Sequence, residues 1–182
     1  MSILKVARMG HPVLRTRAEA IERGDIKGAA VQRLIDDMID TMTEYHGVGL
    51  AAPQVHEGLR LFVAAFDPGQ PETDPDQEDA QQPEPVALIN PEITPLTDEI
   101  VEDWEGCLSI PDIRGRVPRA RHIRVRAYDR RGERLDLRLH DYAARVVQHE
   151  TDHLDGVLFF DRMRSFESLA FLDEYSRYWT KD

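Results

Sequence analysis

The sequence predicts a single domain, residues 1–182, in which helices pack with antiparallel strands, and three stretches support that prediction. Residues 30–45 repeat apolar side chains at the spacing of an amphipathic helix. Residues 122–129 and 134–139 alternate apolar with charged side chains on either side of an Arg-Gly turn, a pattern typical of an antiparallel hairpin. Residues 141–154 are then predicted as a second helix, and a chain of this length can bury a sizeable core.

The first half of the chain is predicted as an arm, a helix and two strands. Residues 4–21 have a mixed pattern and are expected to form an extended arm on the body. The helix at 30–45 stops at Gly47, where the run Gly-Val-Gly-Leu-Ala-Ala-Pro-Gln at 47–54 predicts a loop with accessible backbone. Residues 59–66 and 86–89 are predicted as strands. The helix positions with core spacing are Val31, Leu34, Ile35, Met38, Ile39 and Met42.

An acidic, proline-rich segment, residues 68–85, separates those two strands. It holds five prolines, six acids and no basic residue, so it cannot bury apolar surface and is expected to be a mobile surface insertion. It supplies about half of the formal net charge of −11. This charge argues against nucleic acid or an anionic membrane as a partner.

The second half adds an extended piece from Ile100 to Pro111, the hairpin, the second helix and a last amphipathic helix that starts after Ser165. Asp141 is the expected N-cap of the second helix, which should end near Gly156. The last helix is expected to use Phe166, Leu169, Leu172 and Tyr175 for packing.

The sequence predicts neither a membrane-spanning segment nor a secretory signal. No apolar run approaches membrane-spanning length, and residues 1–8 lack a long apolar core, so a cytoplasmic location is expected. Cys107 is the only cysteine, which excludes an intramolecular disulfide. It is therefore a buried small residue, a nucleophile or a metal ligand.

The strongest functional signal is the His-Glu-x-x-His motif of the second predicted helix. His149 and His153 are four residues apart, so both imidazoles lie on one helix face, where they can bind one divalent metal ion. Glu150 lies at the edge of that face and is a candidate general base for hydrolysis. Taken alone, the motif is equally compatible with a solvated helix that carries two histidines.

A metal site needs a third protein ligand. Phe159 stands where the third histidine of the long-motif metallopeptidases belongs, so the ligand must come from elsewhere. Cys107 is the candidate, because a thiolate with two imidazoles suits zinc or ferrous iron and leaves a fourth position for water. His46 and His56, which flank the Gly-rich loop, are weaker candidates.

Three stretches, in this order, closely resemble the signature motifs of peptide deformylases: residues 47–54, Glu-Gly-Cys-Leu-Ser at 105–109 and Gln-His-Glu-Thr-Asp-His-Leu-Asp-Gly at 148–156. The resemblance spans nearly the whole chain and implies an α+β fold, with antiparallel β-strands packed around the metal-binding helix. It also implies a metal-dependent hydrolase that removes the formyl group from the N-terminal formylmethionine of nascent polypeptides and releases formate.

Residue roles follow from the same resemblance. It makes Cys107, His149 and His153 the metal ligands and Glu150 the general base and acid. The implied metal in the cell is ferrous iron, and zinc, nickel or cobalt would also be accepted by this ligand set. The implied partners are N-formylmethionyl nascent peptides at the ribosome.

The resemblance also implies which residues stabilise the oxyanion and which support the loop that carries a metal ligand. Gln54 and the backbone N–H of Leu108 match the donors that stabilise the oxyanion. Arg114 matches an arginine that pairs with Glu105 and holds the Cys107 loop in place.

Substrate contacts are expected from backbone and from one helix face. The backbone of Val48, Gly49 and Gly106 would hydrogen-bond the peptide as an added strand. Tyr142 and Val146 share the helix face of His149 and are expected either to wall an apolar pocket for the methionine side chain or to be ordinary core. Two other functions stay open at this point, a zinc endopeptidase and a non-catalytic deformylase-like domain that binds peptide.

Overall fold

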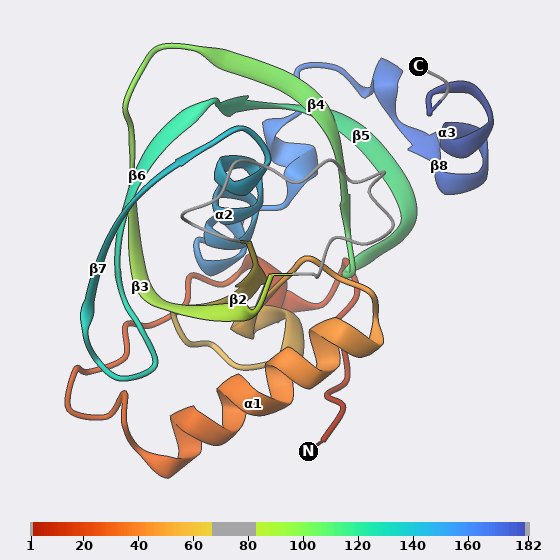
Figure 1. The fold of residues 1–182 in the computed structure, drawn as a ribbon. Helices are drawn as coiled ribbons and strands as arrows, with labels where there is room; N and C mark the ends of the chain where they lie inside the picture. The colour runs from red at the N-terminus through yellow and green to blue at the C-terminus, as the bar shows by residue number, and fades with distance from the viewer. Residues whose placement is uncertain (1, 67–82, 181–182) are drawn as a thin grey trace.

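The computed structural model describes residues 2–66 and 83–180 and has the α+β architecture shown in Figure 1. Its helices are α1 (Ala29–Glu44), α2 (Asp141–Leu154) and α3 (Leu172–Tyr178). Short 3-10 turns occupy Pro12–Arg15, Ala52–Val55, Phe159–Arg162 and Phe166–Ser168. The strands are β1 (Gly49–Ala51), β2 (Leu61–Ala65), β3 (Pro85–Pro95), β4 (Ile100–Cys107), β5 (Ile110–Ala120), β6 (His122–Tyr128), β7 (Arg134–His140) and β8 (Ala170–Phe171).

The larger sheet is fully antiparallel, in the order β1-β2-β3-β6-β7, and has a helix on each face. Alternate residues of β2 point to opposite faces. Phe62 belongs to the core cluster that contains α2, and Val63 belongs to the cluster that contains α1. Because both faces of the sheet are covered, the sequence of β2 is a continuous apolar run and does not alternate with polar residues.

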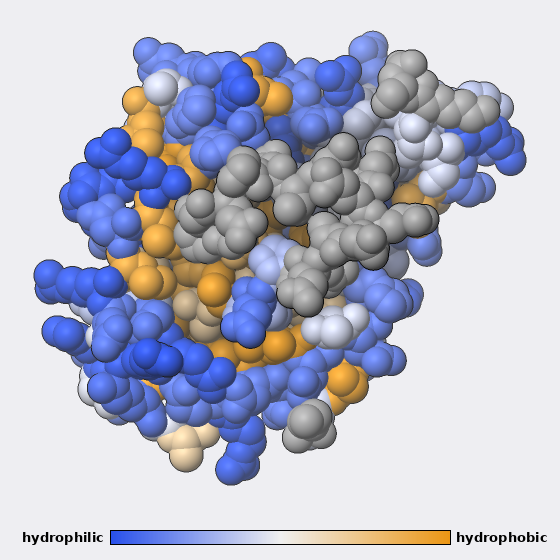
Figure 2. Space-filling model, in the orientation of Figure 1, coloured by the Kyte–Doolittle hydropathy of each residue, from blue (hydrophilic) through white to orange (hydrophobic). Residues whose placement is uncertain are grey.

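The smaller sheet, in the order β4-β5-β8, curves over the opposite side of α2 (Figure 1). The turn between β4 and β5 follows Cys107, whose partner across the hairpin is Ile110. Helix α2 therefore lies between the two sheets, with apolar side chains such as Val147 against the larger one. Figure 2 shows hydrophobic residues gathered toward the middle of one face and hydrophilic residues around its rim.

The predicted first helix, central hairpin and metal helix are confirmed as α1, the β6–β7 pair and α2. The N-cap of α2 is His140, not Asp141, which is the first helical residue and has a positive φ of 48°. The strand predicted at 86–89 is part of the longer β3. Strand β5 was not predicted, because its prolines and arginines hide any alternation and its pairing with β4 is a long-range contact.

The predicted last helix is wrong over its first half. Residues 166–168 form a 3-10 turn, and β8 then pairs with Ile113 and Arg114 of β5 before α3 starts at Leu172. Pairing to this sheet edge outweighs the local helical spacing, and Phe166 is left 68% exposed.

The predicted mobile insertion, residues 68–85, falls mainly outside the described residues. Its last residue, Pro85, begins β3. None of the helices among the described residues has the length and apolar character that a membrane span requires.

Candidate metal centre

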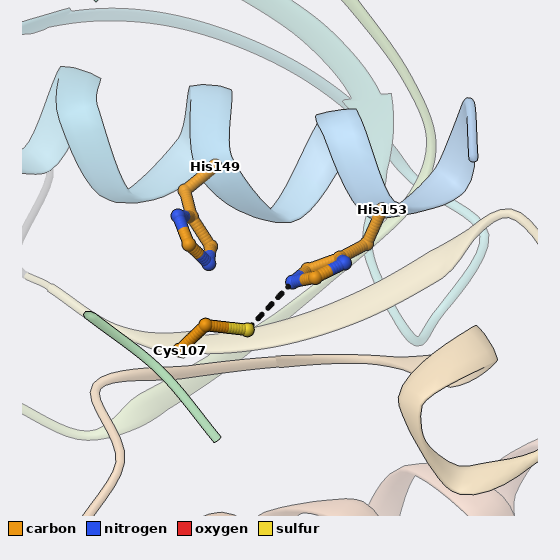
Figure 3. A group of neighbouring side chains, drawn as sticks. All are labelled: Cys107, His149 and His153. Atoms are coloured by element: carbon orange, nitrogen blue, oxygen red, sulfur yellow. Dashed lines mark hydrogen bonds between the residues drawn. The ribbon is translucent and has the colours of Figure 1, made fainter. Parts of the chain in front are cut away.

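Two histidines of α2 and one cysteine of β4 converge in the structure. His149 and His153 lie one turn apart and point toward Cys107 (Figure 3). The Cys107 Sγ lies 3.3 Å from the Nε2 of His153. The three ligand atoms all lie within 4.8 Å of one another. The fold therefore joins residues that are more than 40 positions apart in the sequence.

The donor set fits a divalent metal ion. A thiolate and two imidazoles suit zinc or iron, and three protein ligands leave one coordination position open, as catalytic sites require. Among residues 2–66 and 83–180, this is the one group of histidine, cysteine and acidic side chains gathered closely enough to hold a metal. His46 and His56 lie outside it, and both are exposed.

The outer nitrogen of His149 is held by a buried carboxylate. Its Nδ1 lies 2.9 Å from Oε2 of Glu105, on β4. Arg119, on β5, donates from Nε and Nη2 to the two oxygens of Glu105 at 2.8 and 3.0 Å. Because the arginine keeps this carboxylate ionised, Nδ1 of His149 must donate, and its Nε2 is left to bind a metal.

The predicted pairing of Arg114 with Glu105 is wrong, because Arg119 occupies that place. Residues an odd number of positions apart on one strand point to opposite faces, so Arg114 and Arg119 cannot reach the same carboxylate. The Nη1 of Arg114 donates to the carbonyl of Ile113 at 2.9 Å. Its guanidinium lies against Gly106, where an added Cβ would stand 2.3 Å from Nη1.

The hydrogen bonds and charges around the contact between Glu105 and His149 shift the pKa values of both residues. Burial opposes ionisation of Glu105, but hydrogen bonds from Arg119 and His149 outweigh it and hold the pKa of Glu105 well below its usual range. Burial likewise opposes protonation of His149, and its contacts with Cys107 and Glu105 nevertheless raise its pKa above the ordinary value.

The other side of the site carries buried polar atoms that have no hydrogen-bond partner among the described residues, namely Nδ1 of His153 and Oε2 of Glu150. Burial lowers the pKa of His153 well below its ordinary value, so its imidazole is neutral and able to bind a metal. Burial raises the pKa of Glu150 to about 7. A carboxyl group with such a pKa can accept and return a proton at neutral pH.

The Glu150 side chain rests directly on the backbone of β1. A Cβ placed on Gly49 would lie 2.4 Å from Oε1 of Glu150. The first residue of β1 must therefore be glycine for this carboxylate to occupy its position. This contact explains why position 49, within the stretch predicted as a loop, is a glycine.

Gln54 lies in the 3-10 turn after β1 and is buried. Its Oε1 accepts from the backbone N–H of Ala51 at 2.8 Å, which aims its Nε2 into the site. The Nε2 lies 3.5 Å from Sγ of Cys107 and 3.2 Å from Oγ of Ser109. The side-chain amide is thus fixed beside a metal ligand, and the contribution of Ser109 was not predicted.

The expected substrate-binding residues are distributed around this centre. The carbonyl of Val48 already accepts from the N–H of Ala65 at 2.9 Å. Leu108 follows Cys107 in the turn between β4 and β5. On α2, Tyr142 is 51% exposed, whereas Val146 is buried in the core cluster around this helix.

Besides the contact of Ser109, sequence reasoning missed the contacts of Arg119, Arg145 and Phe159. Arg119 is on a strand that had not been predicted. Arg145, one turn before His149, also contacts Glu105, through a long-range hydrogen bond that helical spacing does not predict. Phe159, which excluded a third histidine, packs its ring at 6.4 Å from that of His149.

Comparisons with known proteins agree with these motifs. The family model described as Polypeptide deformylase matches residues 3–168. Peptide deformylase 2 of Nostoc sp. (strain PCC 7120) is 45% identical over 180 residues, covering 99% of this chain and 97% of that protein. Peptide deformylase 1 of Bordetella pertussis is 42% identical over 168 residues, covering 92% of each.

Solved structures of this kind share the fold. Peptide deformylase from Thermotoga maritima aligns with a TM-score of 0.77 and 40% identity, covering 91% of this chain and 100% of that one. A class I type b peptide deformylase from Acinetobacter baumannii with bound Met-Ala-Ser aligns with a TM-score of 0.79 and 37% identity, covering 90% of this chain and 100% of that one. With a family model matched over most of its length and relatives aligned almost end to end, this chain belongs to the polypeptide deformylase family.

Proposed function

We propose that Cys107, His149 and His153 bind the metal ion with which this chain, a peptide deformylase, removes the formyl group from nascent formylmethionyl peptides. The observation that carries this assignment is the convergence of the three ligand atoms within 4.8 Å, beside a buried Glu150. The family match does not favour the two alternatives, a zinc endopeptidase and a non-catalytic peptide-binding domain.

Ferrous iron is the metal that we propose in the cell, with zinc, nickel and cobalt as substitutes in vitro. A site with one sulfur and two imidazole nitrogens accepts all four ions, so availability in the cell decides the occupant. When bound, such an ion acidifies a water molecule and polarises the formyl oxygen.

Glu150 is proposed as the proton carrier of the reaction. Its carboxylate accepts a proton from the water molecule as the oxygen of that water attacks the formyl carbon. The protonated carboxyl group then returns the proton to the peptide nitrogen as the C–N bond breaks. The products are formate and a free amino terminus. The pKa of about 7, raised by burial, suits both transfers near neutral pH.

Gln54 and the backbone N–H of Leu108 are proposed as the donors to the oxygen that becomes negative during attack. Gln54 is held in advance by its bond from the Ala51 N–H, so little reorganisation is needed when charge develops. Removal of one such donor in other hydrolases typically lowers kcat by about 10²- to 10³-fold.

The substrate peptide is proposed to lie between β1 and β4. Each is the last strand of its sheet in the described topology, so each has an edge to which a peptide can add. Val48, Gly49 and Gly106 are the proposed backbone contacts, and Tyr142 and Val146 the proposed walls of the methionine pocket. A Met-Ala-Ser tripeptide bound in the A. baumannii relative is consistent with this substrate class. We place the reaction in the cytoplasm, on chains that emerge from the ribosome.

The decisive experiment measures formate release from formyl-Met-Ala-Ser by protein purified anaerobically and loaded with ferrous iron. The Glu150→Gln variant is assayed beside it, with metal content measured in both. We expect release by the wild type and a loss of about 10²- to 10⁴-fold in the variant at unchanged metal content. No release by a folded, iron-loaded wild type would refute the proposed function.

A further inference from the structure

Arg145 is a second buried arginine on the carboxylate that supports His149. It lies on α2 one turn before His149, and its side chain is 8% exposed. Its Nη1 donates to Oε1 of Glu105 at 2.8 Å, the same oxygen that accepts from Nε of Arg119. The two oxygens of Glu105 therefore have contacts with two guanidinium groups and one imidazole.

The same guanidinium also joins α2 to the hairpin that carries Cys107. Its Nη2 donates to the carbonyl of Val101 on β4 at 2.8 Å. Its Nη1 donates to the carbonyl of Val117 on β5 at 2.8 Å and lies 3.4 Å from that of Asp103 on β4. One planar group thus connects the helix that holds both histidines with both strands of the hairpin that positions Cys107.

Arg119 is divided between two buried carboxylates, Glu105 and Asp152. Arg119 is shared, because its Nη1 pairs with Asp152 while its Nε and Nη2 pair with Glu105. Two buried carboxylates thus share this guanidinium, and each has one further arginine of its own. Arg162 donates to Asp152, with 2.7 Å between Nη2 and Oδ1, and Arg145 donates to Glu105. A buried carboxylate needs such compensation to remain ionised.

We propose that Arg145 is a positioning residue of the metal centre. It keeps Glu105 in place against Nδ1 of His149 and keeps α2 in fixed register with β4, so that the nitrogen and sulfur ligands retain their separation. The proposal rests on the proposed ligand role of Cys107, His149 and His153. It goes beyond that role because it assigns the geometry of the ligand set to a side chain whose hydrogen bonds go to Glu105 and to the β4–β5 hairpin and not to the three ligands.

A lysine at position 145 tests this role. Lysine retains the charge but lacks the planar fork that reaches the carboxylate and two strands at once. The matched control is Arg60→Lys, since Arg60 donates to the carbonyl of Leu154 and to Asp155 at the other end of α2, away from Glu105. Both variants remove a fork that tethers the same helix. Arg145→Gln serves as a second variant if the lysine form is poorly folded.

Three readouts separate positioning from general support of the fold. They are zinc affinity by competition with a chelator, the ¹H NMR signal of the His149 Nδ1–H in metal-free protein, and the urea midpoint of metal-free protein. Expected for Arg145→Lys are a roughly 10-fold weaker zinc affinity and a shifted or broadened His149 signal. Arg60→Lys should keep both wild-type values even where its urea midpoint falls.

An Arg145→Lys protein with wild-type zinc affinity and an unchanged His149 signal would overturn the inference, whatever its stability. If the proposed metal ligands are wrong, the zinc measurements give a different result. In that case wild type and Cys107→Ser bind zinc equally weakly, while the His149 signal still reports whether Arg145 positions the ring.

Discussion

The two histidines of α2 lie one turn apart on the same helix face, but their outer nitrogens have very different surroundings. Nδ1 of His149 is bound to Glu105, which two arginines hold in place. Nδ1 of His153 is buried and has no hydrogen-bond partner in the described part of the chain. Glu150, between them in sequence, likewise has one buried oxygen without a partner.

This difference indicates that the site is rigid on one side and chemically available on the other. A ligand whose outer nitrogen is hydrogen-bonded keeps one tautomer and one orientation, which preorganises the metal site. Buried polar atoms without partners cost free energy unless a ligand or water satisfies them. We infer that stability is concentrated around His149 and reactivity around Glu150.

Glu105→Gln should produce the largest effect, a loss of stability, because it removes the carboxylate that holds His149 in place. The substitution leaves Arg145 buried without its counter-charge and Arg119 paired with Asp152 alone, and loss of one partner of a buried ion pair typically costs about 3–5 kcal/mol. The free energy of unfolding of metal-free protein, measured in urea, checks this. Glu99→Gln is the control, because Glu99 pairs with Arg121 at the surface and should change little. Equal losses of unfolding free energy in Glu105→Gln and Glu99→Gln would contradict the idea that stability is concentrated around His149.

Gln54→Ala should mainly lower catalytic activity and change stability less. We expect kcat/KM for a formylated peptide to fall by about 10²- to 10³-fold, because a preorganised donor to the developing oxyanion is lost. Gln148→Ala is the matched control, since Gln148 also binds backbone groups, those of Ala120 and Ala144, but makes no hydrogen bond to Cys107. Steady-state kinetics at equal metal content test the pair. Similar kcat/KM values for the two variants would remove Gln54 from the proposed mechanism.

In the metal-free protein, Glu150 should contribute a loss of stability as pH rises from about 4.5 to about 7, whereas His153, whose pKa is lowered, contributes in the opposite direction. Burial raises the pKa of Glu150 from 4.5 to about 7, so the folded state holds a proton that the unfolded state releases in this window. The contribution is present below pH 4.5 and is lost through pH 7, and amounts to roughly 3 kcal/mol. Urea unfolding across this range should show that the stability of wild type, relative to that of Glu150→Gln, falls as pH rises. Parallel curves would refute the assigned pKa.

Gly49→Ala should have the smallest effect of the four. The new Cβ would stand 2.4 Å from Oε1 of Glu150 and would displace that carboxylate. We expect kcat to fall by about 10-fold, since small misplacements of a catalytic group slow reactions. Gly58→Ala is the control, because an added Cβ there meets nothing within 4 Å. A wild-type kcat for Gly49→Ala would show that the Glu150 position is not critical.

The helix ligands and the short-range elements could be predicted because their signals are local. Spacing of four residues fixes His149 and His153 on one face of α2, and alternation predicts the β6–β7 hairpin without any tertiary information. Strand β5 and the start of α3 could not be predicted, because long-range pairing decides both. Arg119 was missed for the same reason, and Arg114 was wrongly given its place.

The sequence by itself determined the helical face that carries two imidazoles and an acid, the single thiol available to complete a metal site, and the family to which the motifs point. Only the tertiary structure decided which arginines hold Glu105, why Gly49 must be glycine, and which histidine has a supported outer nitrogen. The reason is physical: a ligand's residue type and helical spacing are local properties. The partners of a buried charge depend on which strands pair and which face each side chain takes.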